Sequence, residues 1–315
     1  MNTTQARLFS RVRSIWPIRV SLSAEERLAY LFVLPAGLVI ASIAFFPLLR
    51  AFWLSLHDID LRYPAQGQPF VGIGNYISLL ANPRLHNALA VTSAFALVTV
   101  SVELVLGMIV ALIMNQEFRG RGAVRAALLV PWALTTVVSA RMWEWIYNAQ
   151  YGIFNAILKG LSVIDSYRAW TADAQFSFWA ACLADIWKTT PFMALLLLAG
   201  LQVIPRDLYE SAMVDGANAW QRFWSITLPL LKPTVLVALL FRTLDAARVF
   251  DLLFILTGGG PGYSTESLSI LTYRILFTNL NFGMGSAMAV IVFLYVMLIS
   301  FFFIKVLGTK AGRAI

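Results

Sequence analysis

Ionisable side chains recur at helical spacing inside a long apolar stretch of the chain, residues 234–257. They alternate in charge at intervals of three residues: Arg242, Asp245, Arg248 and Asp251. Residues three apart share a helix face, so each can neutralise its neighbour. An ionisable group inside a membrane costs about 2.5–3.5 kcal/mol on insertion scales, so this helix should face protein or water. Guanidinium and carboxylate groups bind hydroxyls well, which favours a polar cavity for a polyhydroxylated ligand.

The apolar stretch 177–203 contains a second polar group. Asp185 and Lys188 are again three residues apart, and Thr189 follows directly. Phe192 follows four residues after Lys188, and plain packing explains its aromatic ring as well as a contact with a ligand does. Glu103 stands alone in the stretch 86–114, where it is either protonated or paired across the bundle with an arginine. We expect the pairing, in a structural role.

These polar groups require membrane-spanning helices to position them. The chain has 315 residues, of which 59% are hydrophobic and 13% charged, and its mean hydropathy is +0.75. Apolar runs of about 20 residues are typical of membrane spans. The sequence therefore predicts an all-α membrane protein with six transmembrane helices, at 28–56, 86–114, 123–147, 177–203, 234–257 and 284–307.

The basic residues predict the orientation of these spans. Lys and Arg are more abundant in the loops on the side of the N-terminus than in the opposite loops. The positive-inside rule then places both termini and the loop 204–233 in the cytoplasm. We expect a basic cytoplasmic segment, 1–27, followed by a transmembrane domain, 28–315. The segment 1–27 fits a basic helix on the membrane surface and a flexible basic tail equally well.

Several kinds of site are disfavoured by the composition. The chain has one cysteine, Cys182, and two histidines, His57 and His86, so we predict no metal site. The phosphate-binding pattern G-x-x-x-x-G-K-[ST] does not occur, so the chain is not expected to bind ATP by itself. The net charge of +8 is largely explained by the cytoplasmic loops, and we predict no nucleic-acid partner.

The predicted cytoplasmic loop 204–233 has a pattern of its own. Asp207 and Glu210 match a capping box at the start of a helix. Gly216 can adopt a left-handed backbone, which would end one short helix and allow another to begin. We predict a helix-turn-helix at the membrane surface. An apolar stripe, which includes Trp220, Phe223 and Trp224, should attach this helix pair to the bundle. In the alternative interpretation, the helix pair has no role beyond this packing.

The same loop carries a long motif with fixed spacing, E-S-A-x3-G-x9-I-x-L-P. Its residues are Glu210, Ser211, Ala212, Gly216, Ile226, Leu228 and Pro229. This motif resembles the E-A-A loop of the membrane subunits of ATP-binding-cassette (ABC) importers, which usually have alanine where this chain has Ser211. The segments 46–56, 186–205 and 239–262 are similar to the carbohydrate-import branch of that family, and most closely to disaccharide permeases of the trehalose and maltose type.

The resemblance implies a type I ABC importer permease fold and a non-catalytic chain that moves a sugar by alternating access. The loop would dock on an ATPase through Glu210, Ser211, Ala212, Asp215 and Gly216. The sugar pathway would include Asp185, Lys188, Thr189, Phe192, Arg242, Asp245 and Arg248.

The resemblance also implies partners and a location. The expected partners are a second homologous permease subunit, two ABC ATPase subunits, an extracytoplasmic sugar-binding protein and the sugar itself. No cofactor is expected in this chain, because ATP and magnesium would bind to the ATPases. The expected location is the plasma (inner) membrane of a bacterium or archaeon, as a multi-pass protein in the lipid bilayer.

Other functions remain open from the sequence. A proton-coupled secondary carrier would use Glu103 or Asp185 as its relay, but such carriers often show inverted repeats and more spans. A membrane-embedded enzyme would need a catalytic constellation, and the two histidines lie outside or at the margin of the predicted spans. Within the importer class, a permease for glycerol phosphate or for another oligosaccharide is an alternative.

Overall fold

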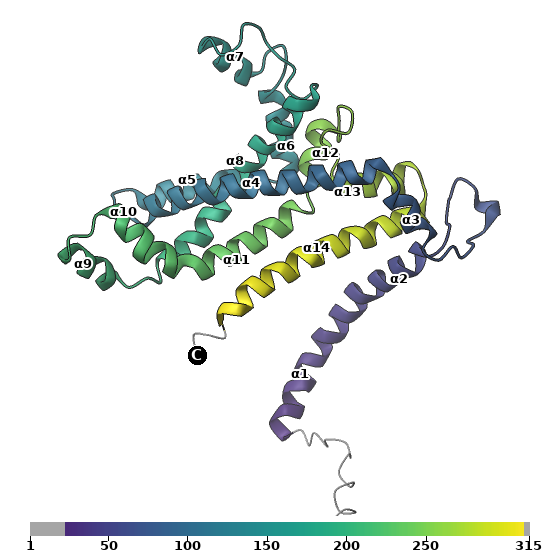
Figure 1. Cartoon of the computed structure of the whole chain (residues 1–315), viewed down its shortest axis with the longest axis horizontal. Helices are drawn as coiled ribbons and strands as arrows, with labels where there is room; N and C mark the ends of the chain where they lie inside the picture. Colours follow the sequence, from purple (N-terminus) through teal and green to yellow (C-terminus); the bar gives the residue numbers. More distant parts are fainter. Residues whose placement is uncertain (1–22, 312–315) are drawn as a thin grey trace, which may run out of the picture. The chain divides into compact units, whose positions relative to one another are not determined.

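The computed structural model describes residues 23–311, and the regular elements in that range are helices (Figure 1). The predicted basic segment 1–27 therefore lies mostly outside the described residues. The α-helices are α1 (Ala24–Ile40), α2 (Phe46–Ser55), α3 (Gly74–Leu80), α4 (Pro83–Asn115), α5 (Arg121–Ala133), α6 (Thr136–Ile146), α7 (Ile153–Gly160), α8 (Ala174–Leu201), α9 (Arg206–Val214), α10 (Ala219–Arg222), α11 (Leu228–Ala246), α12 (Asp251–Thr257), α13 (Leu268–Tyr273) and α14 (Phe282–Ala311).

The chain divides into two compact units, residues 1–50 and 51–315. The first unit contains α1 and the start of α2, joined by a π-helical turn at Ala41–Phe45. From residue 23 on, its described side chains are almost all exposed and mostly apolar, as expected for a helix that faces lipid or another protein. The second unit contains the other helices and the sites described below.

The prediction of an all-α membrane protein is confirmed. Within the described residues five helices are long and apolar enough to cross a membrane, and the pair α5–α6 adds a sixth if it is counted as one span. The five are Arg27–Ser55, Pro83–Asn115, Ala174–Leu201, Ala219–Ala246 and Phe282–Lys305.

The third span differs from the single helix predicted at 123–147. It consists of α5 and α6, which meet at an angle of 90°. Pro131 lies near the end of α5, where its ring removes one backbone donor and crowds the preceding turn. Leu134 and Thr135 then adopt extended backbone, so the chain changes direction before α6 begins.

The fifth span is shifted toward the loop that precedes it. The sequence predicts 234–257, whereas the helix runs over Ala219–Ala246 and the chain leaves it before α12. Asp251 stands in the first turn of α12, where a carboxylate interacts favourably with the helix dipole. The four alternating charges therefore lie on two helices and the turn between them, so the prediction of one continuous charged helix face is wrong.

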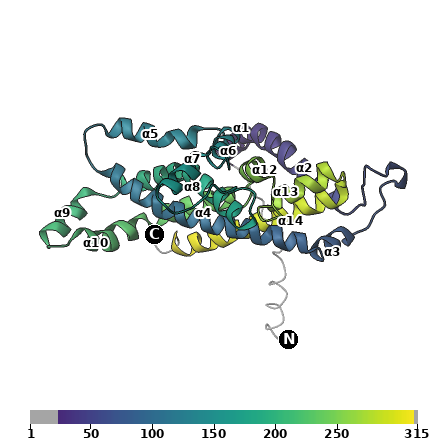
Figure 2. The ribbon, with the colours of Figure 1, turned by 90° about the horizontal axis from the view of Figure 1, so that it is seen from above.

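The second unit is built around α4, α8 and α11, which pack against one another. Figure 2 shows α9 and α10 at one end of this unit and α3 at the other. Gly107 lets α4 approach α8 closely, because a Cβ atom at this position would lie 2.7 Å from Met193 Cγ and 3.2 Å from the backbone nitrogen of Ala194.

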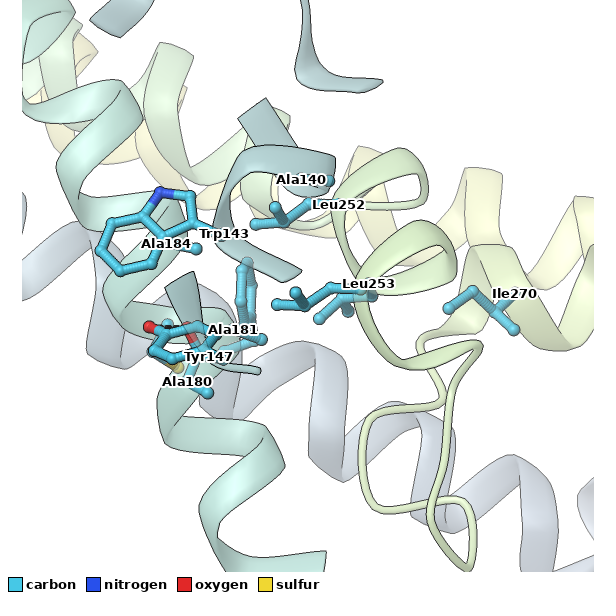
Figure 3. Close-up of a cluster of buried hydrophobic side chains, with 12 residues drawn as sticks. Ala140, Trp143, Tyr147, Ala180, Ala181, Ala184, Leu252, Leu253 and Ile270 are labelled. Carbon is cyan, nitrogen blue, oxygen red and sulfur yellow. Dashed lines mark hydrogen bonds between the residues drawn. The ribbon is translucent and has the colours of Figure 1, made fainter. Parts of the chain in front are cut away.

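A buried apolar cluster joins α6, α8 and α12. Figure 3 shows Trp143 and Tyr147 beside the small side chains of Ala181 and Ala184, with Leu252 of α12 nearby. The Tyr147 hydroxyl donates a hydrogen bond of 3.0 Å to the carbonyl oxygen of Ala180. This cluster holds the bent third span against the rest of the unit.

A buried carboxylate organises the end of the unit that contains α13. Glu266 is fully buried and accepts hydrogen bonds from Arg84 at 2.6 and 2.7 Å and from Arg274 at 2.8 Å. Arg274 also donates to the carbonyl oxygen of Gly258. The glycine-rich segment 257–265 is thus attached to the turn after α13, and Asn87 of α4 donates a hydrogen bond to the carbonyl oxygen of Tyr263.

Gly107→Ala tests the close approach of α4 and α8. The added methyl group would overlap Met193, so we expect the free energy of unfolding to fall by about 1–3 kcal/mol. Gly122→Ala in α5 is the matched control, because no heavy atom lies within 4 Å of its added Cβ. Thermal unfolding of the purified variants measures both effects; equal stability of the two variants would contradict the packing described here.

Candidate functional site

A polar cavity lies among α8, α11 and the start of α12. Its volume is about 160 Å³. It contains all the predicted sugar-pathway residues except Phe192, and its lining is Thr136, Asp185, Lys188, Thr189, Arg242, Asp245, Ala246, Arg248, Val249, Phe250, Asp251 and Leu252.

The wall of this cavity is held by a buried ionic network on three helices. Arg242 of α11 is 2% exposed and pairs with Glu103 of α4, which is 0% exposed. Arg242 Nε donates to Glu103 Oε2 at 2.5 Å, and Nη2 donates to Glu103 Oε1 at 3.0 Å. Nη2 also donates to Asp185 Oδ2 on α8, and Nη1 donates to Asp245 Oδ2 at 3.2 Å. One guanidinium thus joins α4, α8 and α11.

The network changes the expected role of Arg242. Four of the five N–H groups of a guanidinium are used by these four hydrogen bonds, so little capacity remains for a sugar. The predicted pairing with Asp245 along the helix is present, but the buried partners on other helices were not assigned from the sequence. Periodicity on one helix reports pairs within that helix and says nothing about which helix lies opposite.

Glu103 has the cross-bundle partner that the sequence predicts. Both of its oxygens are engaged by Arg242, and Thr189 Oγ1 lies 2.6 Å from Glu103 Oε1. The same hydroxyl lies 2.6 Å from the carbonyl oxygen of Asp185, so it donates to one of the two acceptors at a time. Thr189 therefore supports the network as well as lining the cavity.

The other predicted pathway residues differ in their surroundings. Lys188 and Arg248 line the cavity, and Arg248 Nε donates to the carbonyl oxygen of Leu244 at 3.1 Å. The Phe192 ring instead stacks on Trp132 of α5, with ring centroids 5.8 Å apart, which favours the packing role for Phe192.

The helix pair α9–α10 forms a second candidate site. Gly216 adopts a φ of +82° between the two helices, as the sequence predicts. Glu210, Ser211, Asp215 and Gly216 are exposed, and Ala212 is half-buried. This end of the unit therefore presents a polar turn with a fixed backbone that a partner can contact.

The caps of these helices differ from the prediction. Pro205 is the N-cap of α9 and no side chain caps that end, so the predicted capping box of Asp207 and Glu210 is wrong. A capping box is present instead at α10, where Asn218 and Gln221 exchange hydrogen bonds of 2.8 and 2.9 Å. The fixed backbone φ angle of Pro205 suits the residue before a helix, and α9 begins there without a side-chain hydrogen bond at its N-terminus.

Two polar contacts attach the helix pair to its surroundings. The Tyr209 hydroxyl is 3.0 Å from Thr227 Oγ1, and Arg206 Nη2 donates to Glu117 Oε1 at 2.6 Å. This hydrogen bond from Arg206 lowers the pKa of Glu117. Trp220 and Trp224 are 68% and 51% exposed, so the prediction that they tie the loop to the bundle is wrong. Phe223, the third aromatic residue of that prediction, is half-buried.

The two candidate sites are connected by one helix. α10 continues through a π-helical segment at Phe223–Thr227 into α11, so a single helix runs from Ala219 to Ala246. At a rise of about 1.5 Å per residue, Trp220 and Arg242 are roughly 33 Å apart along this helix. The exposed turn and the cavity wall are therefore joined by this helix, without an intervening loop.

Comparisons with known proteins agree with this architecture. Residues 103–312 match the family described as binding-protein-dependent transport system inner membrane component. The trehalose/maltose transport system permease protein MalF of Thermococcus litoralis is 47% identical, over 90% of this chain and 94% of that protein. The trehalose transport system permease protein SugA of Mycobacterium tuberculosis is 42% identical, over 92% of each.

The fold is shared with a solved structure. A crystal structure of a bacterial ABC transporter involved in the import of the acidic polysaccharide alginate contains a similar chain, with a TM-score of 0.77. The two chains are 21% identical, and the match covers 91% of this chain and 96% of the other. The predicted type I ABC importer permease fold is confirmed.

Arg242→Ala tests the network. Removal of the guanidinium leaves buried carboxylates without a counter-charge, so we expect the free energy of unfolding to fall by about 3–5 kcal/mol. Arg248→Ala is the matched control, because Arg248 is exposed and its hydrogen bond is to the carbonyl oxygen of Leu244, four residues earlier in the chain. Chemical or thermal unfolding of the purified chain in detergent distinguishes the two; an Arg242→Ala variant as stable as Arg248→Ala would show that the network contributes nothing to stability.

Proposed function

Because the chain belongs to the inner membrane components of binding-protein-dependent transport systems, we propose that it carries a disaccharide of the trehalose or maltose type into the cell. It is a multi-pass, non-catalytic permease subunit of an ABC importer in the inner membrane. The names of the related permeases support the choice of sugar.

The observation that carries this proposal is the polar cavity in an otherwise apolar bundle. Its lining combines carboxylates with Lys188 and Arg248, and both kinds of group hydrogen-bond hydroxyls. Ionisable residues in membrane spans typically face a substrate pathway. Asp185, Lys188, Thr189, Asp245 and Arg248 contact the sugar in this proposal, whereas Arg242 orients the carboxylates and Phe192 packs.

The size of the cavity supports a second permease subunit as a partner. The volume of about 160 Å³ is smaller than the 300–1,000 Å³ typical of small-molecule sites. The second, homologous permease supplies the rest of the binding surface in this proposal. The open side of the cavity then faces that subunit.

The exposed helix pair is the proposed docking site for an ATPase. Glu210, Ser211, Ala212, Asp215 and Gly216 form the surface that one of two ABC ATPase subunits grips, and ATP and magnesium bind on those subunits. An extracytoplasmic sugar-binding protein delivers the sugar at the opposite end. In this proposal both termini of the chain lie in the cytoplasm, as the distribution of basic residues in the loops predicts.

Alternating access follows from the helix that joins the two sites. ATP binding brings the two ATPases together and displaces the turn at Gly216. The helix Ala219–Ala246 carries that displacement to Arg242, and the cavity opens outward. Hydrolysis reverses the movement. Coupling of this kind requires an element with two discrete positions, and a continuous helix anchored at both ends can supply one.

A proton-driven carrier is less well supported. Such a relay needs a carboxylate that exchanges protons with water. Glu103 is fully buried, does not line the cavity, and has both oxygens bound to Arg242. Asp185 also binds Arg242.

Co-purification tests the proposal. The tagged chain, extracted gently from its native membrane, should retain a second six-span protein and an ATPase. The complex should hydrolyse ATP faster when a sugar-loaded binding protein is added, and the stimulating sugar identifies the substrate. Stimulation by glycerol phosphate alone would assign a different substrate, and transport in vesicles without ATP would contradict the importer function.

Gly216→Val tests the docking turn. A β-branched residue is strained at a φ of +82°, so we expect the stimulation of ATP hydrolysis by sugar-loaded binding protein to fall at least about tenfold. Gly67→Val is the matched control: Gly67 has a φ of +71°, no heavy atom lies within 4 Å of an added Cβ at either glycine, and Gly67 is remote in sequence from the docking turn. If both variants are stimulated like the wild type, the turn does not transmit the signal.

A further inference from the structure

Two carboxylates of the cavity have an unused oxygen. Asp185 and Asp245 each give one oxygen, Oδ2, to Arg242. Within the described residues no hydrogen bond reaches Oδ1 of either residue. Both residues line the cavity, and the Asp245 side chain is 69% exposed. These two oxygens are therefore available as acceptors for hydroxyl groups.

The position of both carboxylates depends on the orientation of one guanidinium. Arg242 Nη2 meets Asp185, and Nη1 meets Asp245. A guanidinium is planar with its donors in a fixed fork, so a rotation of the group would move both contacts together. The orientation of Arg242 thus sets where two acceptors stand in the cavity.

Glu103 fixes that orientation from the side away from the cavity. It binds Nε and Nη2 in a bidentate pair, the geometry that constrains a guanidinium most strongly. Glu103 is fully buried and is absent from the cavity lining, so it does not touch a ligand there. Thr189 contacts Glu103 Oε1 and restricts the carboxylate in turn.

We propose that Glu103 is a positioning residue for sugar binding, which holds Arg242 so that Asp185 and Asp245 keep their free oxygens directed to sugar hydroxyls. This inference rests on the proposed function of the cavity. Hydrogen bonds from hydroxyls to ionised carboxylates are stronger than neutral ones, so two such acceptors contribute strongly to affinity.

Glu103→Gln is the informative variant because it keeps the shape and removes the charge. The NH2 group of the new glutamine side chain faces N–H donors of Arg242, with which it cannot form a hydrogen bond. We therefore expect Arg242 to turn toward Asp185 and Asp245 and to occupy their free oxygens. The Kd of radiolabelled trehalose is measured by equilibrium dialysis against the complete complex in lipid nanodiscs, without binding protein. We expect the Kd to rise about tenfold, the size expected for losing one hydrogen bond to a charged group.

Two further variants separate positioning from a merely structural role. Glu103→Asp retains the carboxylate and should recover most of the affinity. Leu97→Ala on the same helix is the control, because Leu97 is 71% exposed and lies outside the network, and it should bind trehalose like the wild type. Loss of stability without a change in Kd in Glu103→Gln would show that the residue is only structural, which overturns the inference.

If Glu103→Gln does not assemble into the complex, the Kd of Asp185→Asn for trehalose provides a second test. Asp185→Asn keeps the pair of Glu103 and Arg242 but weakens one acceptor, and it should raise the Kd for trehalose. An unchanged Kd in Asp185→Asn would overturn the inference. If the wild-type complex binds neither trehalose nor maltose, the proposed function fails instead, and the two failures are thereby distinguished.

Discussion

A guanidinium buried in a helix bundle needs a counter-charge and hydrogen-bond acceptors, because burial removes it from bulk water. Arg242 pairs four of its five N–H groups with carboxylates from α4, α8 and its own helix. Such a network adds little net stability to a protein compared with apolar packing. Removal of one charged partner, however, strongly destabilises the protein. Its main effect is therefore to fix the relative positions of three helices and the wall of the cavity between them.

The helix that carries Arg242 also carries the exposed turn at its other end. Because Ala219–Ala246 is continuous, one helix joins the exposed turn that precedes it to Arg242 in the cavity wall. The π-helical segment at Phe223–Thr227 and the side-chain contact of Tyr209 with Thr227 lie where this helix leaves the bundle. The sites are thus linked by covalent geometry as well as by packing, which requires fewer intermediate contacts than a path through separate elements.

The sequence is informative wherever a signal is local. Apolar runs predict the spans, and Gly216 predicts the left-handed turn. Local patterns fail where tertiary contacts decide, as for the bend after Pro131, the end of the fifth span before Asp251, and the exposed tryptophans. The partner of Glu103 could be predicted only as some arginine, because α4 and α11 are far apart in the chain. The buried set around Glu266 was not predicted at all, because its three members come from separate segments.

The order in which the ribosome makes the chain gives the network a further consequence. Glu103 and Arg242 are 139 residues apart in sequence, so α4 enters the membrane long before its counter-charge has been synthesised. A carboxylate in that position is costly in lipid, and during biogenesis it must be protonated, hydrated or shielded by the insertion machinery. The counter-charge of Glu103 becomes available only after α11 has been made, so the ionic network closes late in biogenesis.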